Sequence, residues 1–172
     1  MNFSIPATMR HLIAPRHRLS FPPRLWERLL RELRERGGNE TRESGAFLVG
    51  TRLGNRARVL DFVLYDDLDP HCLDSGIVRF DGRYFDELWD LCRQRELAVV
   101  ADVHVHPSGA GQSESDRAHP MISRAGHIAI IVPSFARKPV HRRDLGIYEY
   151  RGGKQWHVVA TRERERFLHI GI

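Results

Sequence analysis

The fold of this chain is decided by residues 102–116, which read DVHVHPSGAGQSESD. Apolar residues 97–101 lead into this stretch and predict a central strand. His104 and His106 stand one residue apart at the end of that strand, a loop of small residues follows, and Ser113-x-x-Asp116 marks a helix start. No other segment of the sequence gathers as many metal-binding atoms in so few residues, so we expect the rest of the chain to support this one.

The two histidines are spaced to share a ligand. Residues i and i+2 of a strand face the same way, so His104 and His106 project from one side, about 7 Å apart along the backbone. A catalytic zinc commonly takes three protein ligands and leaves a fourth position to water. Asp116 can supply the third ligand if Gly109 and Gly111 let the intervening loop turn tightly. His-x-His alone also suits two surface histidines, but the following Pro107, the Ser-x-x-Asp unit and the flanking apolar strands favour a metal site.

A hydrolytic metal site also needs a general base, and Glu43 is the candidate. It follows a predicted helix and stands directly before a strongly apolar strand. A carboxylate in that place either caps an element, lies on the surface or faces a cleft. Its position alone favours capping or the surface.

Towards the N-terminus, residues 1–20 predict an extended lead-in in which Leu12, Ile13 and Leu19 suit an edge strand. A proline-initiated amphipathic helix follows and ends at Gly37-Gly38. Its buried stripe consists of Leu25, Trp26, Leu29, Leu30 and Leu33. Two strands joined by a turn at Gly54-Asn55 are predicted next, the first over residues 45–51 and the second over 57–64. An acidic turn region (65–76), a short strand (77–80) and a second helix over Phe85 to Cys92 complete this half.

Towards the C-terminus, we expect a short helix over residues 115–123 with Ser113 as its cap, then a buried strand over 127–133. A basic loop (134–143) precedes a hairpin formed by residues 145–150 and 155–160. The tail, 162–172, is charged and then apolar, which suits docking on the domain or on a partner. Strands and helices interleave without repeats or linkers. The pattern predicts one α/β domain, with a mixed β-sheet flanked by helices.

Composition narrows the class of protein. The 172 residues are 41% hydrophobic and 28% charged, typical of a globular domain with a core. No apolar run approaches the roughly 20 residues of a membrane helix, and the first ten residues do not resemble a signal peptide, so we expect a cytoplasmic protein without a membrane partner. The net charge of +5 comes from scattered arginines, which favours a solvated basic surface over a nucleic-acid site.

The two cysteines do not form a CxxC pair, which excludes a disulfide framework and a cysteine-rich zinc finger. Cys92 falls on the apolar face of the second helix and is predicted to be core. Cys72 lies beside His71 in a predicted loop. It suits a semi-exposed thiol better than a reactive one.

Taken together, these residues resemble the JAMM/MPN+ family of zinc metalloproteases, also called JAB-domain peptidases. The resemblance rests on five side chains in their predicted contexts, Glu43, His104, His106, Ser113 and Asp116, and on Pro107. It covers residues 20–160 as the metalloprotease domain, with residues 1–19 as a lead-in and 161–172 as a tail. It implies the MPN fold, which is similar to cytidine deaminase in architecture.

The resemblance also implies roles. His104, His106 and Asp116 would hold Zn²⁺, Glu43 would deprotonate water, and Ser113 would hydrogen-bond the developing oxyanion. The implied reaction is hydrolysis of the peptide or isopeptide bond after the C-terminal glycine of a ubiquitin-like protein, in conjugates or in a precursor. The sequence around the histidines is similar to the prokaryotic JAB group, whose members often accompany activating-like and conjugating-like enzymes.

One feature departs from the family pattern. Nine residues, 107–115, separate His106 from Asp116, where the family usually has about ten. The missing residue falls in the glycine-rich loop before Ser113. We therefore expect the ligands to be kept and the loop over them to differ. Members of this family that act on long ubiquitin chains often carry two insertions that clasp the distal ubiquitin. The present chain is too short for a large second insertion, and residues 65–80 are long enough for a modest first one.

The remaining polar residues have several interpretations. Asp102 shares a face with His104 and is equally suited to support that ligand or to be a strand-end charge. His119 lies one helical turn after Asp116 and favours a surface or supporting role. His71, His127, His141 and His157 have no matching partners in the sequence and are predicted to be structural.

Three other functions stay open at this point. A related peptidase could use the same chemistry on a sulfur-carrier protein or a small peptide. A non-catalytic MPN scaffold would bind partners only, although it would not need the full set of five site residues. A DNA-repair-associated domain of this kind would bind nucleic acid in a strongly salt-dependent way.

Overall fold

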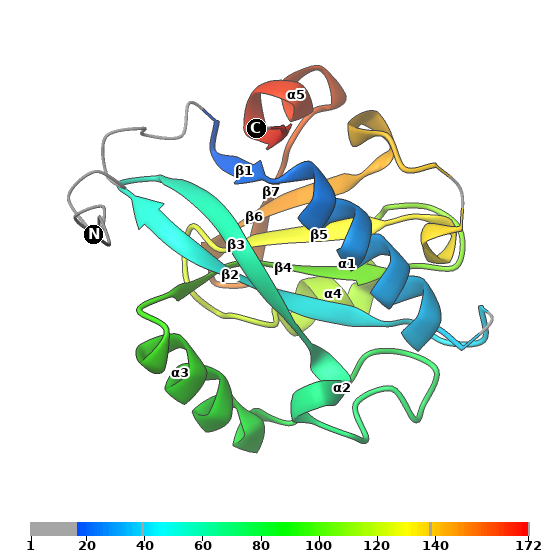
Figure 1. Ribbon diagram of the computed structural model, residues 1–172. Coiled ribbons are helices and arrows are strands. Elements are labelled where there is room, and N and C mark those ends of the chain that lie inside the picture. The colour runs from blue at the N-terminus through cyan, green and yellow to red at the C-terminus, as the bar shows by residue number, and fades with distance from the viewer. Residues whose placement is uncertain (1–16, 39, 138, 172) are drawn as a thin grey trace, which may run out of the picture.

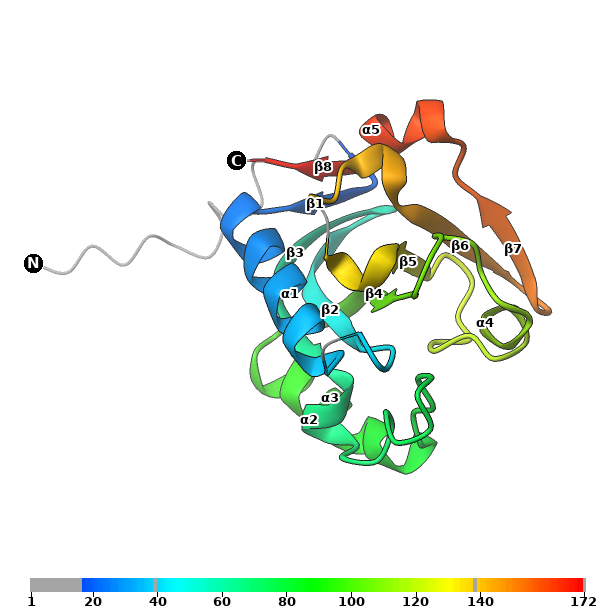
Figure 2. The ribbon, with the colours of Figure 1, turned by 90° about the vertical axis from the view of Figure 1, so that its right-hand side faces the viewer.

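A curled sheet of eight strands forms the centre of the protein (Figures 1 and 2). The computed structural model describes residues 17–38, 40–137 and 139–171. The strands are β1 (Leu19–Phe21), β2 (Gly45–Leu53), β3 (Arg56–Leu64), β4 (Ala98–Val105), β5 (Ile128–Val132), β6 (Gly146–Gly152), β7 (Gln155–Val158) and β8 (Leu168–Ile170). Their order in the sheet is β7-β6-β5-β4-β2-β3-β1-β8.

The helices are short, apart from two. They are α1 (Pro23–Arg36), α2 (Tyr65–Leu68), α3 (Phe85–Gln94), α4 (Glu114–Ala118) and α5 (Arg164–Phe167). Single 3₁₀ turns are η2 (Gly82–Tyr84), η3 (Ser134–Ala136), η4 (Arg142–Asp144) and η5 (Thr161–Glu163). The predicted α/β class with a mixed sheet and flanking helices is confirmed. Among the described residues, no helix combines the length and the apolar character needed to cross a membrane.

The sheet mixes both strand directions. β2 runs antiparallel to β3 and to β4, and β6 runs antiparallel to β5 and to β7. β4 and β5 are parallel, so their carboxyl ends lie side by side at the same end of the sheet. The two histidines lie at this end, and α4 is the next helix after β4 in the chain.

α1 covers one face of the sheet, as its stripe predicts. Trp26, Leu29 and Leu33 are buried in a core cluster that also contains Ala101, Val103 and Val105 of β4. The helix ends where the Gly37 N–H donates to the Leu33 carbonyl. Because residues alternate between the faces of a strand, Asp102 and His104 of β4 point away from α1. Figure 2 shows α1 and α4 on opposite sides of the strands.

A second core cluster fills the other face, under α2 and α3. Phe47 of β2 stands at its centre and makes edge-on ring contacts with Tyr65 and Phe80. Leu88 and Cys92 of α3 are buried there, which confirms Cys92 as a core residue. This cluster fixes the Tyr65 ring beneath β4, a position that matters for the site.

Residues 65–80 differ from the prediction. The strand predicted at residues 77–80 is wrong: the Arg79 N–H donates to the Cys72 carbonyl and the Asp81 N–H to Asp69, so the segment bonds back onto its own loop. The helix α2, which forms a single turn, was not predicted. Cys72 is 1% exposed, and burial together with the nearby Asp69 raises its pKa to about 12. The thiol is therefore neither semi-exposed nor reactive, which corrects both interpretations.

The other predicted elements stand close to their expected places. The hairpin β2–β3, the helix α3, the strand β5 and the hairpin β6–β7 are confirmed. α4 is shorter than predicted and ends at Ala118 because His119 precedes Pro120, a position that disfavours helical backbone. Leu12 and Ile13 of the predicted edge strand lie outside the described residues, whereas Leu19 does begin β1.

The two ends of the described chain meet at one edge of the sheet. β1 pairs in parallel with β3 on one side and with β8 on the other. Leu19 and Leu168 are opposite each other and fully buried in the α1 cluster. The apolar end of the tail therefore docks on the domain as a strand.

Candidate metal centre

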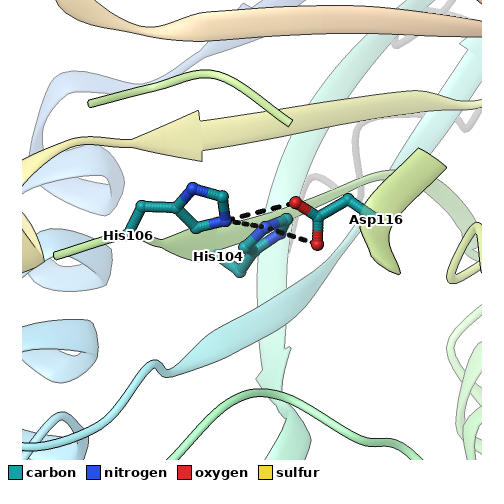
Figure 3. Close-up of side chains that lie close together, drawn as sticks. All are labelled: His104, His106 and Asp116. Carbon is teal, nitrogen blue, oxygen red and sulfur yellow. Dashed lines mark hydrogen bonds and ion pairs between the residues drawn. The ribbon is translucent and has the colours of Figure 1, made fainter. Parts of the chain in front are cut away.

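Two histidines leave the carboxyl end of β4 on the same side. His104 lies within β4, and His106 follows it by one residue. The backbone stays strand-like to this point because the His106 N–H donates to the Val132 carbonyl of β5 at 3.0 Å. As a result, the two imidazoles converge, with their Nε2 atoms 3.0 Å apart (Figure 3). Both side chains are largely buried.

α4 brings Asp116 to the same point. Its Oδ1 lies 3.5 Å from His104 Nε2 and its Oδ2 lies 3.3 Å from His106 Nε2. The direction of the carboxylate is fixed by a capping box, in which the Ser113 N–H donates to Asp116 Oδ2 and the Asp116 N–H donates to Ser113 Oγ. Figure 3 shows the carboxylate pointing at both rings.

This set of atoms fits a tetrahedral metal ion. Ligands placed roughly 2.0–2.1 Å from zinc at tetrahedral angles stand about 3.3 Å from one another. The two imidazole nitrogens are 3.0 Å apart, and each lies 3.3–3.5 Å from one of the two Asp116 carboxylate oxygens, which is close to that spacing. One ligand atom from each of the three residues lies within 4.8 Å of the other two. Two imidazole nitrogens and one carboxylate oxygen are also the donor types of catalytic zinc sites. The structure therefore brings together the three residues predicted as metal ligands.

The electrostatics of the cluster favour a bound cation. Burial lowers the pKa of His104, but hydrogen bonding and attraction to Asp102 and Asp116 outweigh it and raise that pKa to about 9. Burial raises the pKa of Asp116, but His104 and His106 outweigh it and hold that pKa well below its usual range. The carboxylates thus draw positive charge to this point. A metal ion would take the place of the protons they attract.

A buried network stands behind His104. The Asp102 carboxylate is 2% exposed and lies 4.0 Å from His104 Nδ1. It is paired with His127 Nε2 at 2.5 Å and accepts a hydrogen bond from the Tyr65 hydroxyl at 3.2 Å. Burial raises the pKa of Asp102, but hydrogen bonds and attraction to His104 and His127 outweigh this effect and lower the pKa below its usual value. The group is therefore an ionised carboxylate. Of the two interpretations of Asp102, the structure favours support of the ligand.

His127 is the residue of this network that the sequence reasoning missed. It is 3% exposed and stands directly before β5, so its side chain reaches Asp102 across the β4–β5 pair. The available signal was a histidine at the start of a fully apolar strand, where an unpaired polar ring would be costly. Tyr65 gave a weaker signal, because it falls in a region read as turns.

Glu43 lies at the edge of the cluster. Its Oε1 is 3.8 Å from His106 Nε2, and its Oε2 accepts the Val78 N–H at 3.4 Å. The Glu43 N–H donates to the Gly76 carbonyl, so residues 76–78 hold the glutamate from the side. Its side chain is 16% exposed. The carboxylate thus faces the metal ligands instead of the open surface.

Ser113 caps α4 and keeps further hydrogen-bonding capacity. Its Oγ accepts the Asp116 N–H at 3.1 Å, which occupies one acceptor position of the hydroxyl. A serine hydroxyl keeps one O–H donor and a further acceptor position. The residue is exposed beside Asp116, so its O–H can be directed at a bound molecule.

The loop between the histidines and Ser113 is fixed by hydrogen bonds from Ser134 and Tyr148. Its Ser108 carbonyl accepts the Ser134 N–H, and its Ala110 carbonyl accepts the Tyr148 hydroxyl at 2.7 Å. β6 approaches so closely that a Cβ on Gly146 would stand 1.9 Å from the Ala110 oxygen. The loop therefore has a defined path despite lacking one residue.

Two other histidines lie on the surface, outside the converging set. His119 is exposed, with its Nδ1 near the Ser115 carbonyl of its own helix. His71 pairs with Asp74 on the surface. Neither belongs to the set of described residues that converge as metal-binding groups.

Comparison with known proteins finds distant likeness by sequence and broader likeness by structure. The chain is 29% identical over 133 residues to "Probable metalloprotease y4jG" of Sinorhizobium fredii (strain NBRC 101917 / NGR234), which covers 77% of this chain and 82% of that protein. A scan against models of protein families finds no match.

Two solution structures share the fold. A protein of Desulfitobacterium hafniense, DSY2949, matches with a TM-score of 0.61 and 14% identity over 82% of this chain and 89% of its own. A protein of Salinibacter ruber (strain DSM 13855) matches with a TM-score of 0.52 and 16% identity over 82% of this chain and 88% of its own. At these identities the likeness concerns the fold alone.

Proposed function

We propose that this protein is a zinc-dependent peptidase of the JAMM type. The observation that carries the proposal is the convergence of His104, His106 and Asp116 at ligand spacing, with the Glu43 carboxylate 3.8 Å from one of those ligands. The distant relative in Sinorhizobium fredii, which is named a probable metalloprotease, supports the same class of reaction.

Each residue of the proposed site would have a separate role in hydrolysis. A zinc ion held by the two imidazoles and Asp116 would supply Lewis acidity and make water more acidic. Glu43 Oε1 would accept a proton from the attacking water and return it to the leaving amine. The Ser113 O–H would donate to the substrate carbonyl oxygen as negative charge develops there. Asp102 and His127 would orient His104.

The substrate class follows from the resemblance of these motifs. We propose cleavage after the C-terminal glycine of a ubiquitin-like protein, released from a conjugate or from its precursor. Activating-like and conjugating-like enzymes would then be partners in the same pathway. A sulfur-carrier protein is the alternative substrate, and it would require the same five site residues.

Glu43→Gln tests the mechanism. The amide keeps the shape of the side chain but cannot accept a proton, so the cleavage rate should fall by about a hundredfold or more while the metal stays bound. The assay is cleavage of a ubiquitin-like fusion by purified protein, with metal content measured on the same sample. Glu27→Gln, on the exposed side of α1, is the matched control and should keep full activity.

Two outcomes would contradict the proposal. Wild-type turnover by Glu43→Gln would exclude the glutamate as the base. Full activity after exhaustive removal of metal would exclude a metallopeptidase. A parallel assay with a sulfur-carrier precursor decides between the two substrate classes.

A further inference from the structure

A pocket of about 590 Å³ opens at the end of the sheet opposite the metal centre. It lies at the amino ends of β4 and β5, beside α3 and the β2–β3 turn. Its lining includes Ala98 of β4, six residues before His104, which corresponds to about 20 Å along the strand. None of the five predicted site residues lines it, so the pocket needs a separate explanation.

Four arginines line this pocket: Arg18, Arg52, Arg93 and Arg124. Glu96 is the one acidic residue that lines it. Four positive charges and one negative charge leave an excess of +3 on the lining. Arg18 pairs with Glu149 and Arg93 with Asp90 at the margin, whereas Arg52 and Arg124 form no ion pair within the described part of the chain.

Two of the guanidinium groups are held in place by backbone oxygens. Arg52 donates to the Val99 and Val100 carbonyls, each at 3.0 Å. Arg18 donates to the Asn55 and Gly126 carbonyls, and both of these residues line the pocket. Carbonyls satisfy hydrogen bonds without cancelling charge. Burial, followed by repulsion from Arg18 and Arg124, lowers the pKa of Arg52. A bound anion would offset this repulsion among the three guanidinium groups.

Most of the remaining lining is apolar, although Asn55 and His127, the latter paired with Asp102, also contribute. Trp89 and Cys92 of α3 contribute, as do Leu97, Val99 and Ile122. The Trp89 ring is fixed by stacking on Phe85, with the ring planes 11° apart. A flat ring beside fixed arginines suits a ligand with a planar apolar part and several negative charges.

We infer that this pocket binds a nucleotide, with its phosphates among Arg18, Arg52 and Arg124 and its base against Trp89. Arg52 and Arg124, which form no ion pair among the described residues, offer two positive charges, and a diphosphate can pair with both at once, whereas a single carboxylate carries only one negative charge. The volume also admits a base and ribose together with the phosphates. The nucleotide could be free or could be the 5′-phosphorylated end of a strand, because both present the same groups.

The test is calorimetric titration of the full-length protein with ADP at low salt. Pyrophosphate and adenosine serve as partial ligands, and a short 5′-phosphorylated oligonucleotide as the other source of the same chemistry. We expect one ADP per chain, with weaker binding of pyrophosphate and weaker still of adenosine. Arg52→Gln/Arg124→Gln should reduce ADP affinity at least about tenfold, since each lost guanidinium removes charge-assisted contacts to phosphate. Arg124→Gln alone should reduce ADP affinity by a smaller factor. This variant keeps the hydrogen bonds from Arg52 to the Val99 and Val100 carbonyls.

Two controls separate this pocket from other causes. Arg31→Gln removes the same charge from the exposed side of α1, on the opposite face of the sheet, and should leave ADP affinity unchanged. His106→Ala removes a proposed metal ligand and should also leave it unchanged, because the nucleotide does not need the metal. Absence of ADP binding would overturn the inference. So would an equal loss in Arg31→Gln, or loss of binding in His106→Ala.

Discussion

At the scale of single residues, the strongest electrostatic feature is the pairing of His104 with two carboxylates. Its pKa in the folded protein, about 9, exceeds the usual 6.5. In metal-free protein this pairing therefore contributes fully to stability below about pH 6.5, and the contribution is lost as the pH rises towards 9. The pH dependence is opposite for Asp116, whose pKa is lowered in the folded protein. Its pairing contributes fully to stability above pH 3.8, the usual pKa of the group, and this contribution is lost as the pH falls below that value.

We expect metal-free protein to lose about 3 kcal/mol of unfolding free energy between pH 6 and pH 9.5, to order of magnitude. The measurement is the urea unfolding midpoint across that range, in the presence of a chelator. Asp116→Asn removes one of the two carboxylates and should flatten the curve. A wild-type midpoint that stays constant up to pH 9.5 would show that His104 is not protonated in the folded protein.

Asp102 gives a second prediction at this scale. Asp102→Asn keeps the shape of the side chain but removes the charge that faces His104 and His127, so metal affinity should fall about 10- to 100-fold. Competition with a chromogenic chelator measures it. Asp74→Asn breaks the exposed pair with His71 and is the matched control, with no expected change. Unchanged metal affinity in Asp102→Asn would mean that this carboxylate does not orient the ligand.

At the scale of elements, local patterns were enough where each element carries its own signals. α1 combines a proline start, a regular apolar stripe and a glycine end, and β2–β3 combines two apolar strands with a Gly-Asn turn. The convergence of the three candidate metal ligands was also predictable, because His104, His106 and Asp116 fall within a stretch of thirteen residues in a recognisable order.

Three of the misses, at residues 77–80, His127 and Cys72, depend on which segments far apart in the chain do or do not become neighbours. Residues 77–80 have a strand-like composition, but no neighbouring strand offers them hydrogen bonds, so they bond to their own loop. His127 belongs to the site only because β5 lies beside β4, a pairing that no local pattern reveals. Cys72 is buried in a cluster to which β2 and α3 contribute, and α3 begins thirteen residues later in the chain.

The close approach of β6 to the short loop gives a prediction at this scale. In Gly146→Ala the new methyl group must displace the Ala110 carbonyl, and with it the loop that carries Ser113 and Asp116. Metal affinity and stability should both fall, the latter by about 1–3 kcal/mol. Gly109→Ala adds the same methyl group where nothing lies within 4 Å and should behave as wild type. Equal behaviour of the two variants would show that the loop shifts without consequence.

At the scale of the whole molecule, the described ends complete the sheet and the α1 core. Leu168 of β8 is fully buried, so Leu168→Ala should lower the unfolding free energy by about 2–5 kcal/mol. Leu60→Ala removes the same atoms at a position that is 44% exposed and should change it by less than about 0.5 kcal/mol. Urea unfolding measures both. If the two variants are equally stable, the tail does not contribute to the core.

The parallel pairing of β1 with β8 has a consequence under mechanical load. Leu19, Ser20 and Phe21 lie opposite Leu168, His169 and Ile170, so the first and last described strands run side by side in the same direction. A force that pulls the two ends of the chain apart slides these strands past each other and loads all their hydrogen bonds at once, instead of peeling them one by one. The sheet edge thus acts as a clamp. If the chain were pulled through proteins fused to its two ends, the β1–β8 pair would therefore bear the force before the candidate metal centre, whose His104 lies on the inner strand β4.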